Sequence, residues 1–295
     1  SWDDAFAIIT KTLAYTNHTV LAEALEKWPE DMMMRLLPRI YQIIHELNER
    51  HCKRIFDKFS GDWNKCAHMA LISGGLVHMA NLSIIGSHSV NGVSELHSEI
   101  LKKSVFKDFY DDTPEKFTNV TNGIAHRRWL CQSNPRLATL LDKTIGGSYK
   151  KNGPELIKLL AFSNDNAILD KLTEIKAANK KDFAELLYHD SGIKINPDSV
   201  FDVQVKRLHE YKRQLLNALQ IIALYLDLKD NPNMDIVPQT YLFAAKAAPG
   251  YDRAKSIIRL IVDLGEEIAK DPVISKKLQV VFLENYRVTM ADRKS

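Results

Sequence analysis

The sequence predicts an α/β protein with a helix-rich first part and a parallel sheet in its second part. Helical stripes of apolar residues dominate as far as Leu187. From Val200 on, apolar runs of strand length alternate with helical stripes. This alternation is typical of βαβ units, in which neighbouring strands run parallel.

Composition narrows the class of protein. The 295 residues are 45% hydrophobic, enough for one large or two ordinary domains. Forty Lys and Arg against 37 Asp and Glu give a net charge of +3, which indicates neither nucleic acid nor a membrane as a partner. Cys52, Cys66 and Cys131 include no C-x-x-C pair, so no disulfide framework and no metal site are predicted. Without an apolar run of about 18 residues or a signal peptide, we expect a cytoplasmic protein.

The first 121 residues are predicted to form the helix-rich unit. Ser1 can cap an opening helix. The polar residues 16–19 then separate it from a second helical pattern that ends at Trp28 and Pro29. A long helix follows over Leu37–Phe59, with Pro38 in its first turn.

A strand is predicted at Leu82–Ile85, before the polar loop GSHSVNGV and another helix. Gly86 and Gly92 would allow a ligand to approach the backbone, although an ordinary turn explains them equally well. The segment Lys107–Trp129 has little periodicity and is predicted to link two domains.

The second part begins with helices between Leu137 and Leu187. Phe201, Val203 and Val205 then alternate with polar residues, as in a strand. The next helix has an apolar stripe, and further strands are predicted from Tyr241 and over Leu278–Leu283, on either side of one more helix. The stripe consists of Leu215, Leu219, Ile222 and Leu226.

The junction between the first of these strands and its helix is basic. It holds Lys206, Arg207, Lys212 and Arg213. Ligands of parallel α/β sheets bind beyond the carboxyl ends of the strands. Cations near a helix N-terminus oppose the helix dipole by about 0.3–1 kcal/mol each, which an anion would offset. A solvated basic run explains these residues equally well. No glycine-rich phosphate loop follows any strand, which argues against a dinucleotide dehydrogenase or a P-loop nucleotidase.

Six motifs resemble those of the glycogen phosphorylase family, the α-glucan phosphorylases that act on glycogen, starch or maltodextrin. They occur in the family's order and span nearly the whole chain. They are AYTNHTVLAEALEKWP at Ala14, GSHSVNGV at Gly86, TNGI and RRWL from Thr121, FDVQVKRLHEYKRQLLN at Phe201, KAAPGY at Lys246 and FLENYRV at Phe282.

The resemblance implies a truncated two-lobed glycosyltransferase fold of the GT-B type. Residues 1–121 would end the N-terminal lobe, and residues 122–295 would begin the Rossmann-like C-terminal lobe. The family reaction cleaves α-1,4-glucans with inorganic phosphate and releases glucose 1-phosphate. Its cofactor is pyridoxal 5'-phosphate, whose phosphate group works beside the substrate phosphate. The resemblance also implies an allosteric homodimer as the parent enzyme.

Motif positions imply a role for each site residue. Arg207 would hold the substrate phosphate, and Lys212 would lie near both phosphates. Such cations are needed because even two single charges 4 Å apart repel by about 4 kcal/mol at an effective dielectric constant of 20. Lys206, Trp129, Tyr286 and Arg287 would contact the cofactor, His18, Asn122 and Tyr211 would hydrogen-bond the glucosyl unit, and His209 and Tyr251 would lie near the mouth of the site or pack at the domain hinge.

The sequence also departs from the family pattern. Ala244 and Ala245 precede Lys246, where the family usually has at least one glycine. The family's cofactor-binding lysine lies beyond the FLENYRV segment, and no lysine here matches it. We therefore expect an internal phosphorylase fragment that is inactive alone. The alternatives are a non-catalytic fragment that complements other chain segments and a GT-B glycosyltransferase that uses a nucleotide sugar.

Overall fold

The computed structural model describes residues 1–293, which form two compact units. The first unit is Ser1–Ile124 and the second begins at Ala125. We had placed the boundary after residue 121, inside a linker of 107–129. Much of that segment is regular, because it contains α7 (Lys107–Asp112) and β6 (Phe117–Asn119), and only Thr113 and residues 120–125 lack assigned structure.

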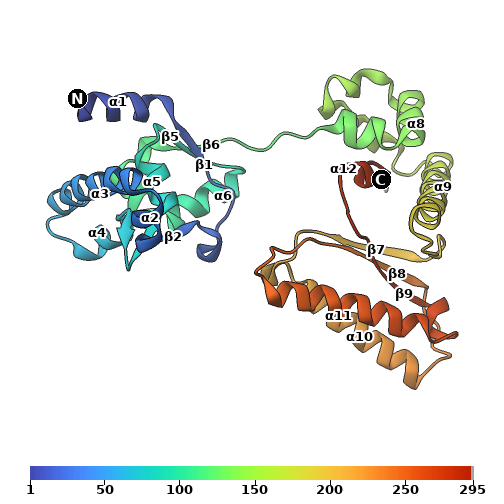
Figure 1. The fold of residues 1–295 in the computed structure, drawn as a ribbon. Helices are drawn as coiled ribbons and strands as arrows, with labels where there is room; N and C mark the ends of the chain where they lie inside the picture. The colour runs from blue at the N-terminus through green and yellow to red at the C-terminus, as the bar shows by residue number, and fades with distance from the viewer. Residues whose placement is uncertain (294–295) are drawn as a thin grey trace. The chain divides into compact units, whose positions relative to one another are not determined.

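The first unit combines helices with two small sheets (Figure 1). One is parallel, with strand order β1-β5-β6, and the other is antiparallel, with order β2-β4-β3. The remaining elements are α1 (Trp2–Thr12), β1 (Ala14–Thr16), η1 (Ala22–Ala24), β2 (Lys27–Pro29), α2 (Glu30–Leu36), α3 (Pro38–Lys58), α4 (Trp63–Met69), β3 (Ile72–Ser73), β4 (Leu76–His78), α5 (Met79–Ile85), β5 (Ser89–Gly92), α6 (Glu95–Ile100), η2 (Leu101–Val105) and η3 (Pro114–Lys116).

Two of the predicted helices are confirmed in this unit. The Ser1 hydroxyl accepts a hydrogen bond from the Asp4 N–H at 3.2 Å and caps α1, and α3 begins at Pro38. The predicted strand Leu82–Ile85 is wrong, because these residues lie in α5 and the strand β5 follows in the predicted loop. The second helical pattern is also wrong, since it contains only the short helix η1 and strand β2.

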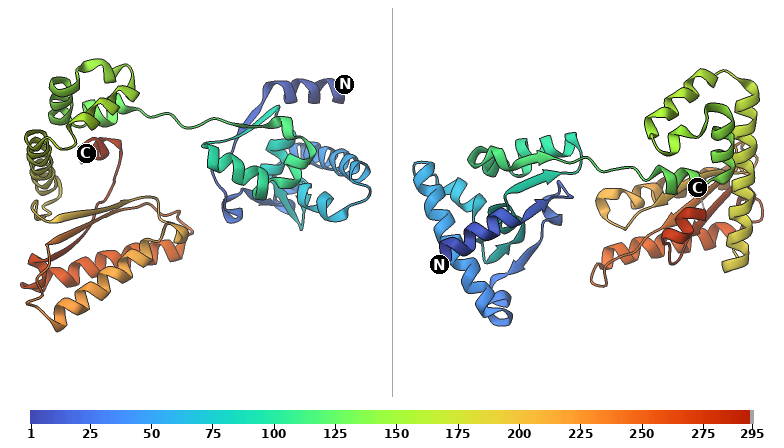
Figure 2. Two further views of the ribbon diagram at one scale, coloured as in Figure 1. Left: turned by 180° about the vertical axis from the view of Figure 1, so that it is seen from behind. Right: turned by 90° about the horizontal axis from the view of Figure 1, so that it is seen from above.

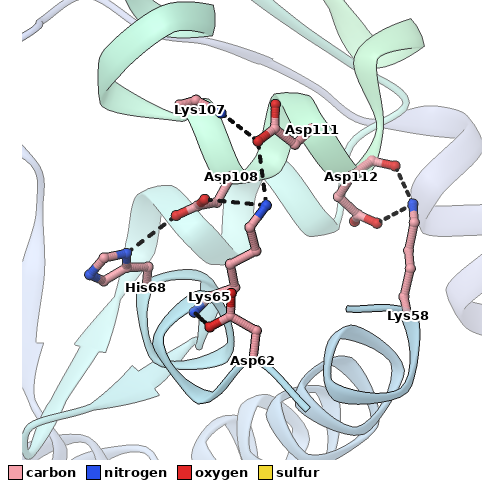
Figure 3. Close-up of polar contacts among 8 residues, drawn as sticks. All are labelled: Lys58, Asp62, Lys65, His68, Lys107, Asp108, Asp111 and Asp112. Atoms are coloured by element: carbon pink, nitrogen blue, oxygen red, sulfur yellow. Dashed lines mark hydrogen bonds and ion pairs between the residues drawn. The ribbon is translucent and has the colours of Figure 1, made fainter. Parts of the chain in front are cut away.

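Ion pairs connect the helices α3, α4 and α7 (Figure 3). The buried Asp112 carboxylate accepts hydrogen bonds from Arg54 at 2.6 Å and Lys58 at 2.8 Å. Lys65 lies 3.4 Å from Asp111 and 3.8 Å from Asp108. Burial alone would raise the pKa of Asp112, but the hydrogen bonds from Arg54 and Lys58 outweigh it and hold the pKa at about 2.

Replacement of Asp112 by asparagine should destabilise the first unit by about 1.5 kcal/mol. The neutral amide cannot accept both charged hydrogen bonds, although Arg54 and Lys58 remain half exposed and water replaces part of the loss. Urea unfolding at pH 7 measures the change. Asp111→Asn, at a more exposed carboxylate, is the control and should cost less than half as much. Equal losses in the two variants would contradict the importance of burial at Asp112.

The second unit contains a parallel sheet, as predicted, and its strand order is β7-β8-β9. In register, Asp202 lies opposite Tyr241, which lies opposite Val280. Figures 1 and 2 show α10 and α11 together on one side of this sheet. The elements are η4 (Arg127–Gln132), α8 (Pro135–Ile145), η5 (Gly147–Lys150), η6 (Gly153–Phe162), α9 (Asn166–Ser191), β7 (Val200–Val205), η7 (Glu210–Lys212), α10 (Gln214–Asp230), β8 (Gln239–Ala244), α11 (Asp252–Ala269), η8 (Ile274–Lys276), β9 (Leu278–Phe282) and α12 (Val288–Arg293).

Alternate residues of β8 pack against different helices. Tyr241 and Phe243 join the core formed with α10 and α11, whereas Leu242 and Ala244 join the core formed with α9. Both faces of the central strand are therefore buried, which explains the run of apolar residues from Tyr241 to Ala244.

The predicted apolar stripe of α10 is not its buried face. Leu215, Leu219 and Leu226 are 39%, 50% and 54% exposed. The buried positions are instead Ala218, Ile221, Tyr225 and Leu228. Helical spacing identified the helix correctly but not its orientation, because α10 is apolar on more than one side.

Neither a membrane-spanning helix nor a metal-binding cluster is present in residues 1–293. None of their helices combines the length and apolar character that crossing a membrane requires. Across the same residues, no group of three or more His, Cys, Asp or Glu side chains is arranged to hold a metal ion.

Candidate functional site

The loops that follow β7 and β8 and the segment after β9 line an open cavity of about 250 Å³. It therefore lies beyond the carboxyl ends of parallel strands, where ligands of α/β sheets bind. Its lining consists of Val205, Lys206, Arg207, Ala244, Ala245, Lys246 and Tyr286.

Backbone bonds and buried side chains hold the loop that carries Lys206 and Arg207. The N–H of Lys206 donates to the carbonyl of Ala244 at 3.1 Å, and the N–H of Leu208 donates to that of Lys246 at 3.2 Å. The Leu208 side chain is buried in the core. The buried Gln214 amide nitrogen lies 3.3 Å from the carbonyl oxygens of both Lys206 and Arg207. The loop is thus fixed, while its two cationic residues remain exposed.

The cavity carries uncompensated positive charge. Within residues 1–293, no carboxylate lies within 4.0 Å of the charged nitrogens of Lys206, Arg207 or Lys246. Burial raises the pKa of the half-buried Tyr286, so its hydroxyl remains protonated and can donate a hydrogen bond at neutral pH. The cavity therefore offers cations and a neutral donor, which suits an oxyanion.

Three residues predicted to act with this group do not line the cavity. Lys212 lies in η7 with its ammonium 5.6 Å from the Tyr211 ring. Trp129 lies in η4 beside Arg128. Arg287 donates to the Thr289 hydroxyl at 3.0 Å and lines a different cavity.

A second polar cluster connects the loops after β7 and β8, and it adds Glu210 and Arg253, which were not predicted, to the predicted His209, Tyr211 and Tyr251. The Glu210 carboxylate accepts hydrogen bonds from Arg253 at 2.7 Å and from the Tyr251 hydroxyl at 2.9 Å. The His209 ring lies 5.5 Å from that of Tyr211 and 6.0 Å from that of Tyr251. Lys246 was also missed as a site residue, although its motif KAAPGY was recognised.

Two of the residues predicted to bind the glucosyl unit lie in the first unit. His18 follows β1 and Asn122 follows β6, the two strands that flank β5. Because these strands are parallel, both residues lie at the carboxyl edge of one sheet. The N–H of Asn122 donates to the carbonyl of Val93 at 3.1 Å, and both side chains are exposed. Tyr211, predicted to bind the same sugar, belongs to the second unit.

Arg213, the fourth cation of the basic junction, shapes the backbone. It precedes α10 with φ of 63° and joins η7 to that helix. Few non-glycine residues adopt this left-handed conformation, and it turns the chain between the two helices. Arg213 does not line the cavity.

Comparison with known proteins agrees with the motifs. The family model Phosphorylase (carbohydrate phosphorylase) matches residues 1–294. The chain is 48% identical over 293 residues to glycogen phosphorylase of Bacillus subtilis (strain 168), with 99% of this chain and 37% of the relative aligned. It is 50% identical over 295 residues to the muscle form of Oryctolagus cuniculus and 49% identical to the brain form of Rattus norvegicus, each aligned over 99% of this chain and 35% of the relative. The chain spans about a third of the length of these relatives, and it belongs to the carbohydrate phosphorylase family.

Proposed function

We propose that this chain supplies the phosphate-binding part of an active site for phosphorolysis of α-1,4-glucans. The observation that carries the proposal is the cavity beside Lys206, Arg207 and Lys246, with cations that no carboxylate among the described residues neutralises. Inorganic phosphate is the co-substrate, and glucose 1-phosphate is the product. Glycogen, starch and maltodextrin are the candidate glucans.

The chemistry of the cavity favours phosphoryl groups. Guanidinium and ammonium groups form short, charge-assisted hydrogen bonds with phosphate oxygens. The volume of about 250 Å³ is smaller than the range of about 300–1,000 Å³ that is usual for larger ligands. A phosphoryl group fits within this volume, but the pocket is open to solvent and does not limit the size of the rest of the ligand.

The same cavity fits the phosphate group of pyridoxal 5'-phosphate. Lys206 and Tyr286 would hold that group, Arg207 would hold the substrate phosphate, and Lys212 would stabilise the charge of both from the adjoining helix η7. Trp129 and Arg287 are assigned to the rest of the cofactor. When bound, the cofactor supplies a phosphate that can donate or accept a proton beside the substrate phosphate. The cations lower the repulsion between the two groups.

His18, Asn122 and Tyr211 are assigned to the hydroxyl groups of the glucosyl unit. The first two side chains are exposed at one sheet edge and carry the hydrogen-bonding groups that a sugar requires. In this proposal the two units are parts of the two lobes of a GT-B enzyme, and that enzyme is a cytoplasmic, allosterically regulated homodimer. Because no lysine here matches the cofactor lysine, the isolated chain is inactive.

Phosphate titration of the chain, followed by ³¹P NMR or calorimetry, tests the site. Arg207→Gln should weaken phosphate binding about tenfold, because it removes one charge-assisted hydrogen bond of at least about 1.4 kcal/mol. Arg213→Gln is the matched control, since it removes the same charge nearby but outside the cavity. A solvated basic run would instead lose affinity equally in both variants, and that result would contradict the proposal.

A non-catalytic role is the second candidate, because the relatives are almost three times as long as the chain. In that role the chain pairs with segments from another polypeptide. Mixing it with the remaining segments of the B. subtilis relative and assaying glucose 1-phosphate formation separates the two cases. Glucose 1-phosphate formed by the pure chain would show that the fragment is active alone.

A further inference from the structure

An open cavity of about 380 Å³ lies in the first unit, whereas the candidate phosphate site belongs to the second. Side chains of α1, α3, α5 and α7 line it, together with Lys116 of η3. Its volume falls within the range of about 300–1,000 Å³ that is usual for small-molecule sites. None of the residues assigned to phosphorolysis lines this cavity, so it needs an explanation of its own.

Most of the cavity wall is apolar. A spacing of four residues places Trp2 and Phe6 on one face of α1, and both side chains line the cavity. Ile84 of α5 and Phe109 of α7 are the least exposed part of the wall. Such a wall accepts an apolar ligand body, and its aromatic rings favour a flat one. The apolar lining consists of Trp2, Phe6, Leu47, Ile84, Ile85 and Phe109.

One buried polar atom in the wall lacks a partner. His51 is only 6% exposed, lines the cavity, and stacks its ring on that of Phe109. Its Nε2 atom has no hydrogen-bond partner within residues 1–293. Buried polar atoms of native proteins are nearly always hydrogen-bonded, because a bond left unmade costs free energy. A molecule in the cavity with a polar group at this place would supply the missing bond.

Lys116 adds a positive charge to the same wall. Its half-buried ammonium donates to the carbonyls of Ile84 at 3.2 Å and Ile85 at 3.4 Å, which leaves one of its three N–H groups. Among the described residues, no carboxylate lies within 4.0 Å of this ammonium. Burial lowers the pKa of Lys116, because the ammonium has lost water without gaining a carboxylate. An anion in the cavity would compensate for that loss.

The other cations of the cavity are already paired, which limits the charge of the anion. Arg50 lies 3.1 Å from the Asp3 carboxylate, and Arg54 binds both oxygens of Asp112. Figure 3 shows Asp112 facing Lys58 as well. A dianion would therefore find only one uncompensated ammonium in this wall, which suits a single negative charge instead.

A carboxylate matches the two open polar groups. One oxygen can accept a hydrogen bond from the Lys116 ammonium. The other can accept from His51, because a neutral imidazole can carry its single N–H on Nε2. An apolar body attached to the carboxylate then covers the aromatic part of the wall.

We propose that this cavity binds a small organic molecule that combines one carboxylate with an apolar, preferably aromatic, body. The carboxylate binds Lys116 and His51, and the body packs against Trp2, Phe6 and Phe109. This site goes beyond the proposed function, since it requires neither phosphate nor glucan. Because α1, α3, α5 and α7 all contribute to it, occupancy should also stabilise the first unit.

Titration of the unmodified chain with hydrocinnamate, an aromatic carboxylate, tests the site. Calorimetry should give one site with a Kd below about 1 mM. NMR of the labelled chain should show shifts of the Trp2 indole and the His51 ring. Hydrocinnamyl alcohol has the same body without the charge, and acetate has the charge without the body, so each should bind at least tenfold more weakly.

Three outcomes of this titration would overturn the proposal. They are the absence of binding, an alcohol that binds as tightly as the acid, and binding that leaves the signals of Trp2 and His51 unchanged. The second outcome would identify a purely apolar cavity, and the third would place the acid elsewhere on the chain.

Two lysine variants test the role of the charge. Lys116→Gln removes the ammonium but keeps an amide that can donate to the carbonyls of α5, so it should weaken hydrocinnamate binding at least tenfold. Lys103→Gln is the matched control and should leave the affinity within twofold, because Lys103 is 77% exposed and does not line the cavity. Equal losses in the two variants would show that only the general charge of the protein attracts the acid.

His51→Phe tests the second polar contact. Phenylalanine keeps an aromatic ring beside Phe109 but lacks Nε2, so it should weaken the acid at least fivefold and the alcohol less than twofold. Equal effects on both probes would mean that His51 acts only through packing, which contradicts the proposed contact. If a variant does not fold, the comparison of acid and alcohol on the unmodified chain still decides.

Discussion

Replacing His51 with phenylalanine should make the first unit less sensitive to acid. His51 is only 6% exposed on α3, and its ring stacks on Phe109 with centroids 6.3 Å apart. Its Nε2 atom has no hydrogen-bond partner within residues 1–293. Burial, and then the charge of Arg54, lower the pKa of His51 from 6.5 to about 4, with Lys116 acting in the same direction and Asp112 opposing it.

The sign of the pH effect follows from this lowered pKa. The folded unit keeps His51 neutral, whereas the unfolded chain takes up a proton below about pH 6.5. The stability that the neutral ring provides is therefore complete above pH 6.5 and is lost as the pH falls toward about 4. A shift of this size corresponds to about 3 kcal/mol. His51→Phe should lack this loss, although carboxylates still titrate in both proteins.

Urea unfolding between pH 7 and pH 4 measures the difference. Tryptophan fluorescence reports mainly the first unit, which contains Trp2, Trp28 and Trp63, while only Trp129 lies in the second. His68→Gln is the control for removal of a histidine from the surface of the same unit, because the His68 side chain is 74% exposed. Parallel losses in the unmodified chain and in His51→Phe would show that His51 is not responsible.

Gly265→Ala should destabilise the second unit by about 2 kcal/mol, although alanine is the better helix former. A Cβ atom at residue 265 of α11 would lie 2.5 Å from the carbonyl oxygen of Val280 in β9. A backbone atom of the central sheet cannot move aside, so the helix must shift, and such overpacking costs about 1–3 kcal/mol or more. The gain in helix propensity is only about 1 kcal/mol, so the clash decides the sign.

Calorimetry can follow this change if the two units unfold separately. Gly250→Ala provides the comparison, because a Cβ atom there would meet nothing within 4 Å and the backbone is not in the left-handed region. The free energy of unfolding of the Gly250→Ala variant should stay within about 0.5 kcal/mol of that of the unmodified chain. A Gly265→Ala variant as stable as the unmodified chain would mean that α11 and β9 can separate without loss.

Long and strongly patterned elements were predictable from the sequence. The helix α3 and the strands β7, β8 and β9 each carry enough apolar residues to show their period. The strands β1, β5 and β6 were missed because they have only three or four residues, and β5 reads SVNG. Pairing with distant segments, rather than local propensity, makes such short stretches strands.

The candidate site was predictable only where its residues are neighbours in sequence. Lys206 and Arg207 follow a clear strand, so their place at the sheet edge could be inferred from the pattern. Tyr286 was predicted as a site residue only because of the family resemblance. Lys246 reaches the same cavity because β8 pairs with β7, and contacts between Glu210 and Arg253 likewise depend on that pairing. Periodicity contains no information on which strands become neighbours.

The amide of Gln214 has a consequence for ligand binding. It ties the carbonyls of Lys206 and Arg207 before any anion arrives, so the mutual repulsion of the nearby positive groups is already present in the empty folded protein. This repulsion destabilises the folded protein, and the loop needs little rearrangement when an anion enters the cavity. Anions that occupy the cavity should therefore reduce this repulsion. The second unit should unfold at a higher temperature in phosphate buffer than in another buffer of the same ionic strength.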